Sequence, residues 1–553
     1  MTSGIRQGCP LSPLIFAVCM DLLLRRLRQV LGDDYVQRAF ADDVGLILGD
    51  VQGQLPTLIK ALREFELISR MQVNIKKTVG VPLWPEKEEK AKELLQRVAP
   101  EWSALPIQKA AVYLGCVIGP DKEAKEWERA LTKYQARARG WQWAPLGLHF
   151  AALVYNTYVL SVLSFTAQVA RVSEEVKHVE AMCLRLAAPG PFAWASPQDL
   201  WHLEQHYGMP KSFNSIATVA AASKLRLVSN DNLQEGGMRL SAMTAKVKEA
   251  YLQLAFPSRM VWLESWRRDA IPTVLEENRE ELRRKGIRGE VLLQQLRGKL
   301  RPGKSEEETD KLARSRLQRE ARIQIQGQDG YNSLDRIRHK LMRWNLGGLP
   351  RKTGERFACS IEKMGQLVPP RVAAAVFGTA WNRWCTARRF QKRSCQINTC
   401  KLGCGGNAED SIEHYSRCSI MKACHDKELG IRAAWLLPYW LGVQESCSQD
   451  VWLARGALGA YAANRCTNAA RQAGGWHADT TRRAFQQALL EGAAGHKKLL
   501  QHLPAHDYAA ARKRPRDPHL EKAKSKVGNM SMAKAKNAKN EADEVVESAG
   551  DTI

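Results

Sequence analysis

Two short β-prone runs, residues 35–40 and 44–48, flank an adjacent pair of aspartates, Asp42 and Asp43. A strand pattern excludes adjacent acidic residues from its interior, so we expect the pair at the tip of a hairpin. Both carboxylates would then project into one space. Adjacent carboxylates repel unless a cation lies between them, and two divalent ions about 3.5 to 4 Å apart can stabilise the attacking and leaving oxygens of phosphoryl transfer. Taken alone, such a pair is more often an ordinary turn.

Three further motifs accompany the hairpin in a fixed order. Upstream lies a glycine-rich segment, residues 4–16, in which Gly4 and Gly8 allow close backbone approach and Pro10 and Pro13 fix the entry into a helix. Downstream come Asn-Ile-Lys-Lys-Thr at 74–78 and Tyr-Leu-Gly-Cys at 113–116. In this order and spacing, the motifs resemble the reverse transcriptases of LINE-type (non-LTR) retrotransposons and group II introns.

The resemblance implies an RNA-directed DNA polymerase, a nucleotidyltransferase encoded by a transposable element. It implies Mg²⁺ at the polymerase site, and RNA template, DNA primer or target DNA, and deoxynucleoside triphosphates as partners. The residues that match family motifs are Asp42 and Asp43 (catalytic, metal-binding), Gln7, Gly8 and Lys77 (substrate-binding), and Tyr113, Leu114 and Gly115 (primer grip). Read without the resemblance, Gln7 could simply cap a helix and Lys77 could be a solvated charge.

One metal-binding carboxylate of the family is not found in these residues. The family's first palm motif supplies a further Asp upstream of the glycine-rich segment, whereas the sequence begins three residues before that segment. We therefore expect a C-terminal fragment that shows no measurable primer extension. Whether this chain is an enzyme stays open at this point. The alternative is a non-catalytic nucleic-acid-binding remnant that uses thumb, basic helices and zinc knuckle.

The chain is long enough for several domains, since one hydrophobic core rarely grows beyond about 250 to 300 residues. We expect an α+β palm fragment, a mainly α-helical thumb and linker, a small zinc knuckle and a disordered basic tail. The predicted ranges are 1–120 (partial palm), 121–240 (helical thumb), 241–390 (basic helical linker), 391–430 (CCHC zinc knuckle), 431–503 (helical C-terminal region) and 504–553 (tail).

The charge balance favours a polyanionic partner, because 83 Lys and Arg oppose 58 Asp and Glu, for a net charge of +25. Residues 311–352 hold eleven basic and three acidic residues together with Tyr331 and Trp344, and could contact phosphates and stack on bases. A solvated helix surface explains this segment equally well. Further candidates precede the cysteine cluster, namely Trp381, Trp384, Arg388, Arg389, Phe390, Lys392 and Arg393. The tail between 512 and 539, with ten basic and two acidic residues, suits a nuclear localisation signal, RNA binding or plain solvation.

Cys400, Cys404, His414 and Cys418 offer three thiolates and one imidazole within nineteen residues, a suitable set for a closed, structural Zn²⁺ site. Cys395 could replace Cys400 as the first ligand. The segment resembles the Cys-Cys-His-Cys knuckle that follows the thumb in many non-LTR retrotransposon proteins, where it is thought to hold RNA or target DNA.

The thirteen cysteines and the absence of a signal-peptide pattern favour a reducing compartment, nuclear or cytoplasmic. Residues 149–170 form a long apolar stretch, but six polar residues interrupt it. We therefore expect buried helices there rather than a transmembrane segment, and no membrane partner.

Overall fold

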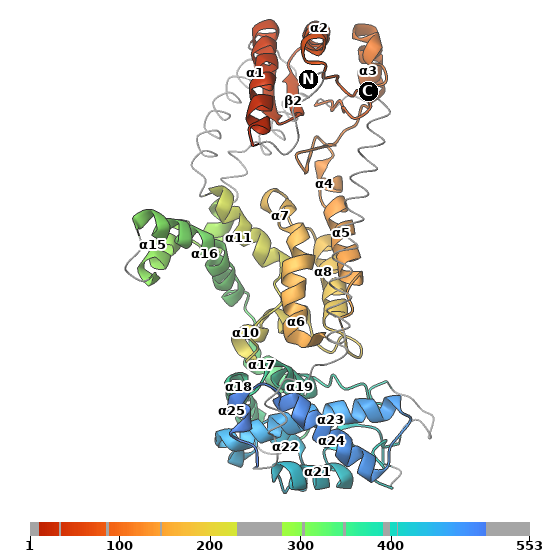
Figure 1. Cartoon of the computed structure of the whole chain (residues 1–553), viewed down its shortest axis with the longest axis vertical. Coiled ribbons are helices and arrows are strands. Elements are labelled where there is room, and N and C mark those ends of the chain that lie inside the picture. The colour runs from red at the N-terminus through yellow and green to blue at the C-terminus, as the bar shows by residue number, and fades with distance from the viewer. Residues whose placement is uncertain are drawn as a thin grey trace. The chain divides into compact units, whose positions relative to one another are not determined.

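The structure is a computed structural model that describes residues 10–32, 35–83, 88–143, 146–228, 279–300, 305–346, 350–390, 399–405 and 408–504. This part of the chain is mostly helical (Figure 1). It holds two small antiparallel sheets. It forms two compact units, the first from residues 1–141, 156–183 and 214–330 and the second from 142–155, 184–213 and 331–553. No helix in the described ranges is long and apolar enough to cross a membrane.

The first unit begins with an α+β region around one apolar cluster. Pro13 stands in the first turn of α1 (Ser12–Leu31), where its missing N–H is no loss, and Leu23 and Leu27 of α1 pack against Leu58 of α2. The remaining elements of this region are β1 (Tyr35–Phe40), β2 (Asp43–Leu48), α2 (Val51–Ser69), α3 (Glu88–Val98), η1 (Pro100–Trp102), β3 (Ala111–Tyr113) and β4 (Cys116–Ile118). The expected mixture of short strands and helices is present here.

The rest of the first unit is helical. It contains α4 (Lys122–Lys125), α5 (Glu128–Arg139), η3 (Tyr155–Val159), η4 (Leu160–Leu163), α7 (Thr166–Val169), α8 (Glu174–Ala187), α11 (Ile216–Val228), α15 (Gly289–Lys299) and α16 (Glu306–Gly327). The apolar stretch 149–170 forms short helices whose Val159, Leu163 and Ala167 are buried, as expected. The Glu180 carboxylate is also buried, and it accepts a hydrogen bond of 2.7 Å from the Ile216 N–H at the start of α11.

The second unit is an all-helical body with an aromatic core that includes Phe377, Trp381, Trp384 and Trp440. Its elements are α6 (Gly147–Val154), α9 (Pro197–Trp201), α10 (Leu203–His206), α17 (Ser333–Met342), α18 (Pro350–Leu367), α19 (Pro370–Ala380), α20 (Ile412–Tyr415), α21 (Ser419–Leu429), α22 (Leu437–Trp440), η5 (Glu445–Ser448), α23 (Asp450–Gln472), α24 (Ala478–Ala493) and α25 (Lys497–Leu500).

A buried polar network joins two distant stretches of the second unit. Asp199 is fully buried and accepts two hydrogen bonds from Arg336, at 2.9 and 2.7 Å, and one of 2.7 Å from the Tyr331 hydroxyl. Burial alone would raise the pKa of Asp199, but hydrogen bonds from Arg336, Ser196 and Tyr331 outweigh it and lower the pKa to about 2. Asp199 is therefore a charged group whose two side-chain donors, Tyr331 and Arg336, lie 132 and 137 residues away in sequence.

Four aromatic residues proposed above for base stacking are engaged inside the protein instead. Trp344 is 4% exposed and donates to the Ala380 carbonyl, while Trp381 and Trp384 are buried in the core. Tyr331 is part-buried, binds Asp199 and stacks on a histidine ring. The prediction that these rings are free for nucleic acid was therefore wrong, because Trp and Tyr also supply the largest apolar surfaces for a core.

The two compact units divide the chain differently from the predicted domain ranges. Those ranges stay predictions. Helices of the 121–240 range contribute to both units, and the Cys/His segment shares the second unit with residues 431–503. Pro302 and Gly303, Cys395 and the tail from residue 505 lie outside the described residues.

Candidate functional site

The Asp42–Asp43 pair lies at the tip of a β-hairpin. Strands β1 and β2 pair antiparallel with Phe40 opposite Asp43, so the predicted hairpin is confirmed. Ala41 has φ of +53°, a left-handed conformation that normally favours glycine at this place in a two-residue turn. Both aspartates are exposed. The strained turn thus presents two carboxylates to solvent.

A second hairpin packs against the first. Strands β3 and β4 are joined through Leu114 and Gly115, whose φ values of +49° and +81° suit a tight hairpin turn. The Tyr113 hydroxyl donates a hydrogen bond of 3.2 Å to the Arg38 carbonyl of β1. A Cβ at Gly45 of β2 would lie 3.2 Å from the Tyr113 ring, so glycine gives that ring its place. The residues proposed as the primer grip therefore adjoin the hairpin that carries the aspartates.

Lys77 is exposed and lies in a turn. Its backbone N–H donates to the backbone carbonyl and to the side chain of Asn74, at 3.0 and 3.1 Å. Among the described contacts, none involves the Lys77 side chain. Gln7 and Gly8 fall outside the described residues.

In the described part of the chain, three or more metal-ligating side chains gather in one place, at Cys400, Cys404, His414 and Cys418. No third such side chain joins Asp42 and Asp43 among the same residues. Two carboxylates alone leave most of the ligand positions of a Mg²⁺ pair to water, substrate or other protein groups.

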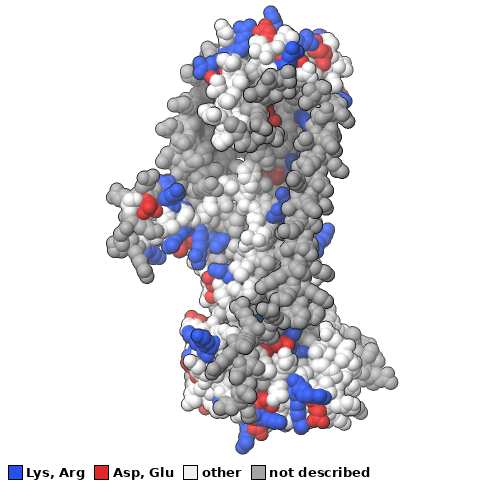
Figure 2. Space-filling model, viewed as in Figure 1, with Lys and Arg blue, Asp and Glu red and all other residues white. Residues whose placement is uncertain are grey.

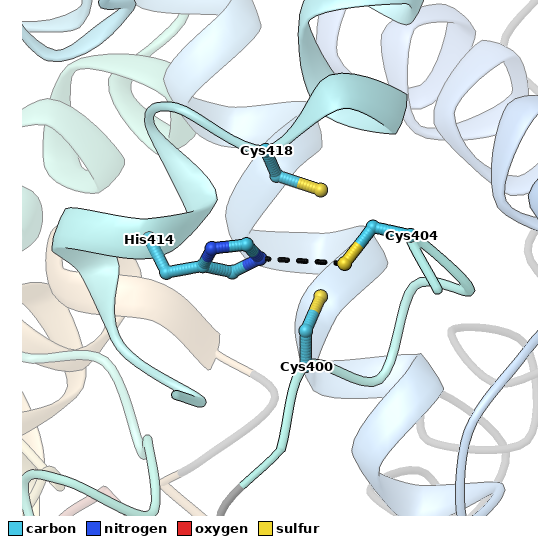
Figure 3. Close-up of side chains that lie close together, drawn as sticks. All are labelled: Cys400, Cys404, His414 and Cys418. Carbon is cyan, nitrogen blue, oxygen red and sulfur yellow. Dashed lines mark hydrogen bonds between the residues drawn. The ribbon is translucent and has the colours of Figure 1, made fainter. Parts of the chain in front are cut away.

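The four ligand atoms of the Cys/His cluster lie within 4.8 Å of one another. Figure 3 shows the three sulfurs and the His414 ring directed into one small space, with Cys404 Sγ 3.7 Å from His414 Nε2. A tetrahedral Zn²⁺ with metal–sulfur bonds of about 2.3 Å needs ligand atoms about 3.8 Å apart. The arrangement therefore fits this metal with four protein ligands.

Backbone structure positions these ligands. Ser411 caps α20 by accepting a hydrogen bond from the His414 N–H, and Cys418 is the N-cap residue of α21. Gly403 has φ of +77°, and a Cβ there would lie 2.6 Å from the Trp476 carbonyl. The loop between the first two cysteines is thus folded tightly against the segment that precedes α24.

Electrostatics favour a thiolate at the buried end of the cluster. The thiol of Cys400 donates a hydrogen bond to Cys418, which holds the pKa of Cys418 below its usual range. Hydrogen bonds from His414 and the Met421 N–H act in the same direction. The shared hydrogen bond raises the pKa of Cys400. A thiolate is the form that binds metal.

Asp410 ties the cluster to the rest of the unit. Its carboxylate accepts hydrogen bonds from the Tyr415 hydroxyl at 2.6 Å, from Arg471 at 3.0 Å and from the Ala387 N–H at 2.8 Å. Sequence reasoning missed this residue, whose only signal was its place four residues before the histidine. A buried carboxylate with three donors acts as a structural anchor.

Comparisons with known proteins agree with the motif order. Residues 1–118 match the family described as "Reverse transcriptase (RNA-dependent DNA polymerase)". The Retrovirus-related Pol polyprotein from type-1 retrotransposable element R2 of Popillia japonica is 35% identical over 85 residues, which make up 14% of this chain and 12% of that polyprotein. No solved structure matches the chain significantly.

The paired hairpins, the ordered motifs and the family match define residues 1–118 as a reverse transcriptase segment, and this part of the chain belongs to that family. Its similarity to the R2 polyprotein supports a reverse transcriptase of the non-LTR kind. The resemblance drawn from the sequence is thereby confirmed.

Proposed function

We propose that the chain serves RNA-directed DNA synthesis by a non-LTR retrotransposon, with Asp42 and Asp43 as ligands of catalytic Mg²⁺. The observation that carries the proposal is the exposed carboxylate pair on a strained hairpin tip, within a segment that matches reverse transcriptases. Bound Mg²⁺ would stabilise the attacking and leaving oxygens of nucleotidyl transfer. The carboxylates hold and orient the ions.

The neighbouring residues suit the template, primer and nucleotide. The exposed Lys77 ammonium is suited to bind a triphosphate. Gln7 and Gly8 are the other proposed substrate-binding residues. Tyr113, Leu114 and Gly115 form a tight turn beside the aspartate hairpin, a suitable place for a primer terminus. RNA template, DNA primer or target DNA, and deoxynucleoside triphosphates are the proposed partners.

Primer extension on an RNA template tests this proposal. The 553-residue chain should be compared with a longer form that adds an acidic palm motif and fingers upstream, because Asp42 and Asp43 lack a third carboxylate among the described residues. We expect extension by the longer form only, and its loss in Asp42→Ala and Asp43→Ala. Asp21→Ala is the matched control, since Asp21 is exposed on α1 and pairs with Arg25. Undiminished synthesis by the hairpin variants would place the metal site elsewhere.

We further propose that Cys400, Cys404, His414 and Cys418 hold one structural Zn²⁺. Three thiolates and an imidazole favour Zn²⁺ over Mg²⁺, because soft sulfur ligands disfavour a hard cation. Elemental analysis should find about one zinc per chain, and Cys404→Ser should lose it while Cys447→Ser, a buried cysteine outside the cluster, should retain it. Equal zinc in the two variants would contradict the proposed ligand set.

A second candidate function is non-catalytic binding of nucleic acid by the helices and the Cys/His cluster. It is favoured by the absence of a third carboxylate beside Asp42 and Asp43 in the described residues. It predicts nucleic-acid binding without synthesis in every form of the chain, including the upstream-extended one. A nuclear or cytoplasmic location is proposed for both functions.

A further inference from the structure

We propose that Phe192, Phe390 and Arg389 form a platform on the second unit that binds an unpaired stretch of nucleic acid by base stacking and phosphate contact. The inference rests on the proposed handling of nucleic acid by this chain, but it requires no polymerase activity. The platform lies in a different unit from the Asp42–Asp43 hairpin.

Phe192 is held in an unfavourable backbone conformation while its ring remains in solvent. Its φ is +53° and its exposed fraction is 67%. A bulky residue in the left-handed region is strained, and a ring that is two thirds exposed recovers little of that free energy through burial. Stability therefore does not account for a phenylalanine at this position, whereas ligand contact would.

The surrounding loop is rigidly anchored, which explains how the strain persists. The Pro189 carbonyl accepts a hydrogen bond of 3.0 Å from Arg383, and the Trp194 carbonyl accepts one of 3.0 Å from Lys340. The Trp194 indole N–H donates back to the Ala188 carbonyl at 2.9 Å. The loop is thus fixed on both sides of Phe192, so the ring is presented with little freedom to lose on binding.

A second exposed aromatic ring and a cation complete the surface. Phe390 is 41% exposed, and its ring centroid lies 5.9 Å from that of Phe192. The Arg389 guanidinium lies 5.4 Å from the centre of the Phe192 ring. Its buried Nε finds no hydrogen-bond acceptor among the described residues. This cation therefore has an aromatic neighbour but no anionic partner in that part of the chain.

Two more cations, Lys340 and Arg343, lie near enough to Arg389 for their charges to interact. Burial lowers the pKa of Lys340 to about 8; the charges of Arg336, Arg343 and Arg389 act in the same direction, and the Asp199 carboxylate opposes them. No carboxylate in the described ranges forms an ion pair with these three side chains, because the neighbouring Asp199 is bound to Arg336 and Glu409 and Glu413 are near Arg388. Arg343, Arg389 and Lys340 thus form a local group of positive charges without an ion-pair partner in the described ranges.

On the side of the molecule that Figure 2 shows, Lys and Arg are interspersed with Asp and Glu over the described surface. Exposed rings beside unpaired cations match the requirements of a single strand, whose bases have free faces. A duplex would offer phosphates to Arg389, but its bases are already stacked on each other. We therefore favour an unpaired strand over a duplex or an acidic peptide.

The Cys/His cluster is linked to the platform through Asp410. Arg389 and Phe390 belong to a turn in which the Phe390 N–H donates to the Thr386 carbonyl. The preceding Ala387 N–H donates to Asp410, four residues before His414. Metal at the cluster should therefore help to hold Phe390 in place.

Binding is tested with the full chain and fluorescent dT12, U12 and a matched 12-base-pair duplex, followed by anisotropy over a range of salt. Phe192→Ala/Phe390→Ala should weaken binding of the single strands by at least about tenfold, since stacking contributes about 1 to 3 kcal/mol per base, and should leave the duplex within twofold. Arg389→Gln should weaken single-strand binding and reduce its salt dependence. Phe150→Ala and Arg432→Gln, which alter an exposed ring and an exposed cation of the same unit, should change neither.

Photocrosslinking localises the strand. A 4-thiouridine-containing 12-mer should crosslink to peptides that contain Phe192 or Phe390, and the zinc content of the variants should stay unchanged. In the anisotropy assay, unaltered dT12 and U12 affinity of Phe192→Ala/Phe390→Ala would refute the platform. Equal losses of affinity for single strand and duplex would refute it as well. Tighter binding of polyglutamate than of dT12 would indicate a protein partner instead. The dT12 and U12 arms distinguish DNA from RNA. In the upstream-extended form, Asp42→Ala should lose primer extension and keep single-strand binding, so failure of this inference can be told apart from failure of the polymerase proposal.

Discussion

The buried carboxyl of Glu180 should make the first unit less stable as the pH rises. Burial raises the pKa of Glu180 from 4.5 to about 8, although the hydrogen bond from the Ile216 N–H opposes the shift. A carboxyl with a raised folded-state pKa stabilises the fold most below pH 4.5, and this contribution is lost progressively as the pH approaches 8. A shift of this size corresponds to a loss on the order of 5 kcal/mol.

Glu180→Gln should remove this dependence, because the amide oxygen can still accept from Ile216 but cannot ionise. Cys183, the nearby thiol, does not complicate the window, since burial raises its pKa to about 11. A chain with two units need not unfold in one step, so opening of α8 and α11 is best followed by hydrogen exchange.

The measured quantity is the opening constant of α8 and α11 in the wild type divided by the same constant in Glu180→Gln at equal pH. This ratio should rise by up to about tenfold per pH unit between pH 5 and 8. Comparison at equal pH cancels the intrinsic change in exchange rate. Glu175→Gln, an exposed change on the same helix, should follow the wild type. A flat ratio for Glu180→Gln, or the same rise for Glu175→Gln, would refute the reasoning.

Three other substitutions test the second unit and the hairpins. Asp199→Ala should lower the stability of the second unit by about 3 to 5 kcal/mol, because it leaves the partly buried Arg336 unpaired. The measurement is urea unfolding followed by tryptophan fluorescence. As the control, Asp335→Ala at an exposed position should change the stability by less than about 0.5 kcal/mol. Gly403→Ala should speed zinc release more than Gly405→Ala in a chelator assay, because both have positive φ but only a Cβ at Gly403 meets backbone, at 2.6 Å; equal rates would deny the clash a role. Gly45→Val should displace Tyr113 and reduce primer extension by the upstream-extended form, and unchanged extension would show that this ring contact is dispensable.

Local patterns in the sequence predicted the features that depend on neighbouring residues. The aspartate hairpin followed from two β-prone runs around an acidic pair, and the assembly of Cys400, Cys404, His414 and Cys418 followed from their spacing. In both cases a few residues close in sequence determine the geometry. Ligand residues within nineteen positions have few ways to meet.

Features that depend on distant partners could not be read in this way. The segment 311–352 was expected to offer aromatic rings to nucleic acid, yet Tyr331 binds Asp199 and Trp344 binds Ala380. Composition gives the number of rings but not the direction each one faces. Phe192 lay outside every basic segment considered, and its significance depends on a backbone angle that the sequence does not display.

The second unit is assembled from stretches of chain that are synthesised at widely separated times. Helices α6, α9 and α10 precede residue 214, but their partners, such as Arg336 and α19, follow residue 331. During synthesis at roughly 5 to 20 residues per second, these early helices would wait several seconds with their apolar faces uncovered. The contacts are also long-range, a topology that slows folding. A ribosome that stopped before residue 331 would therefore release a chain whose early helices have nothing to pack against, and such chains should aggregate or be degraded.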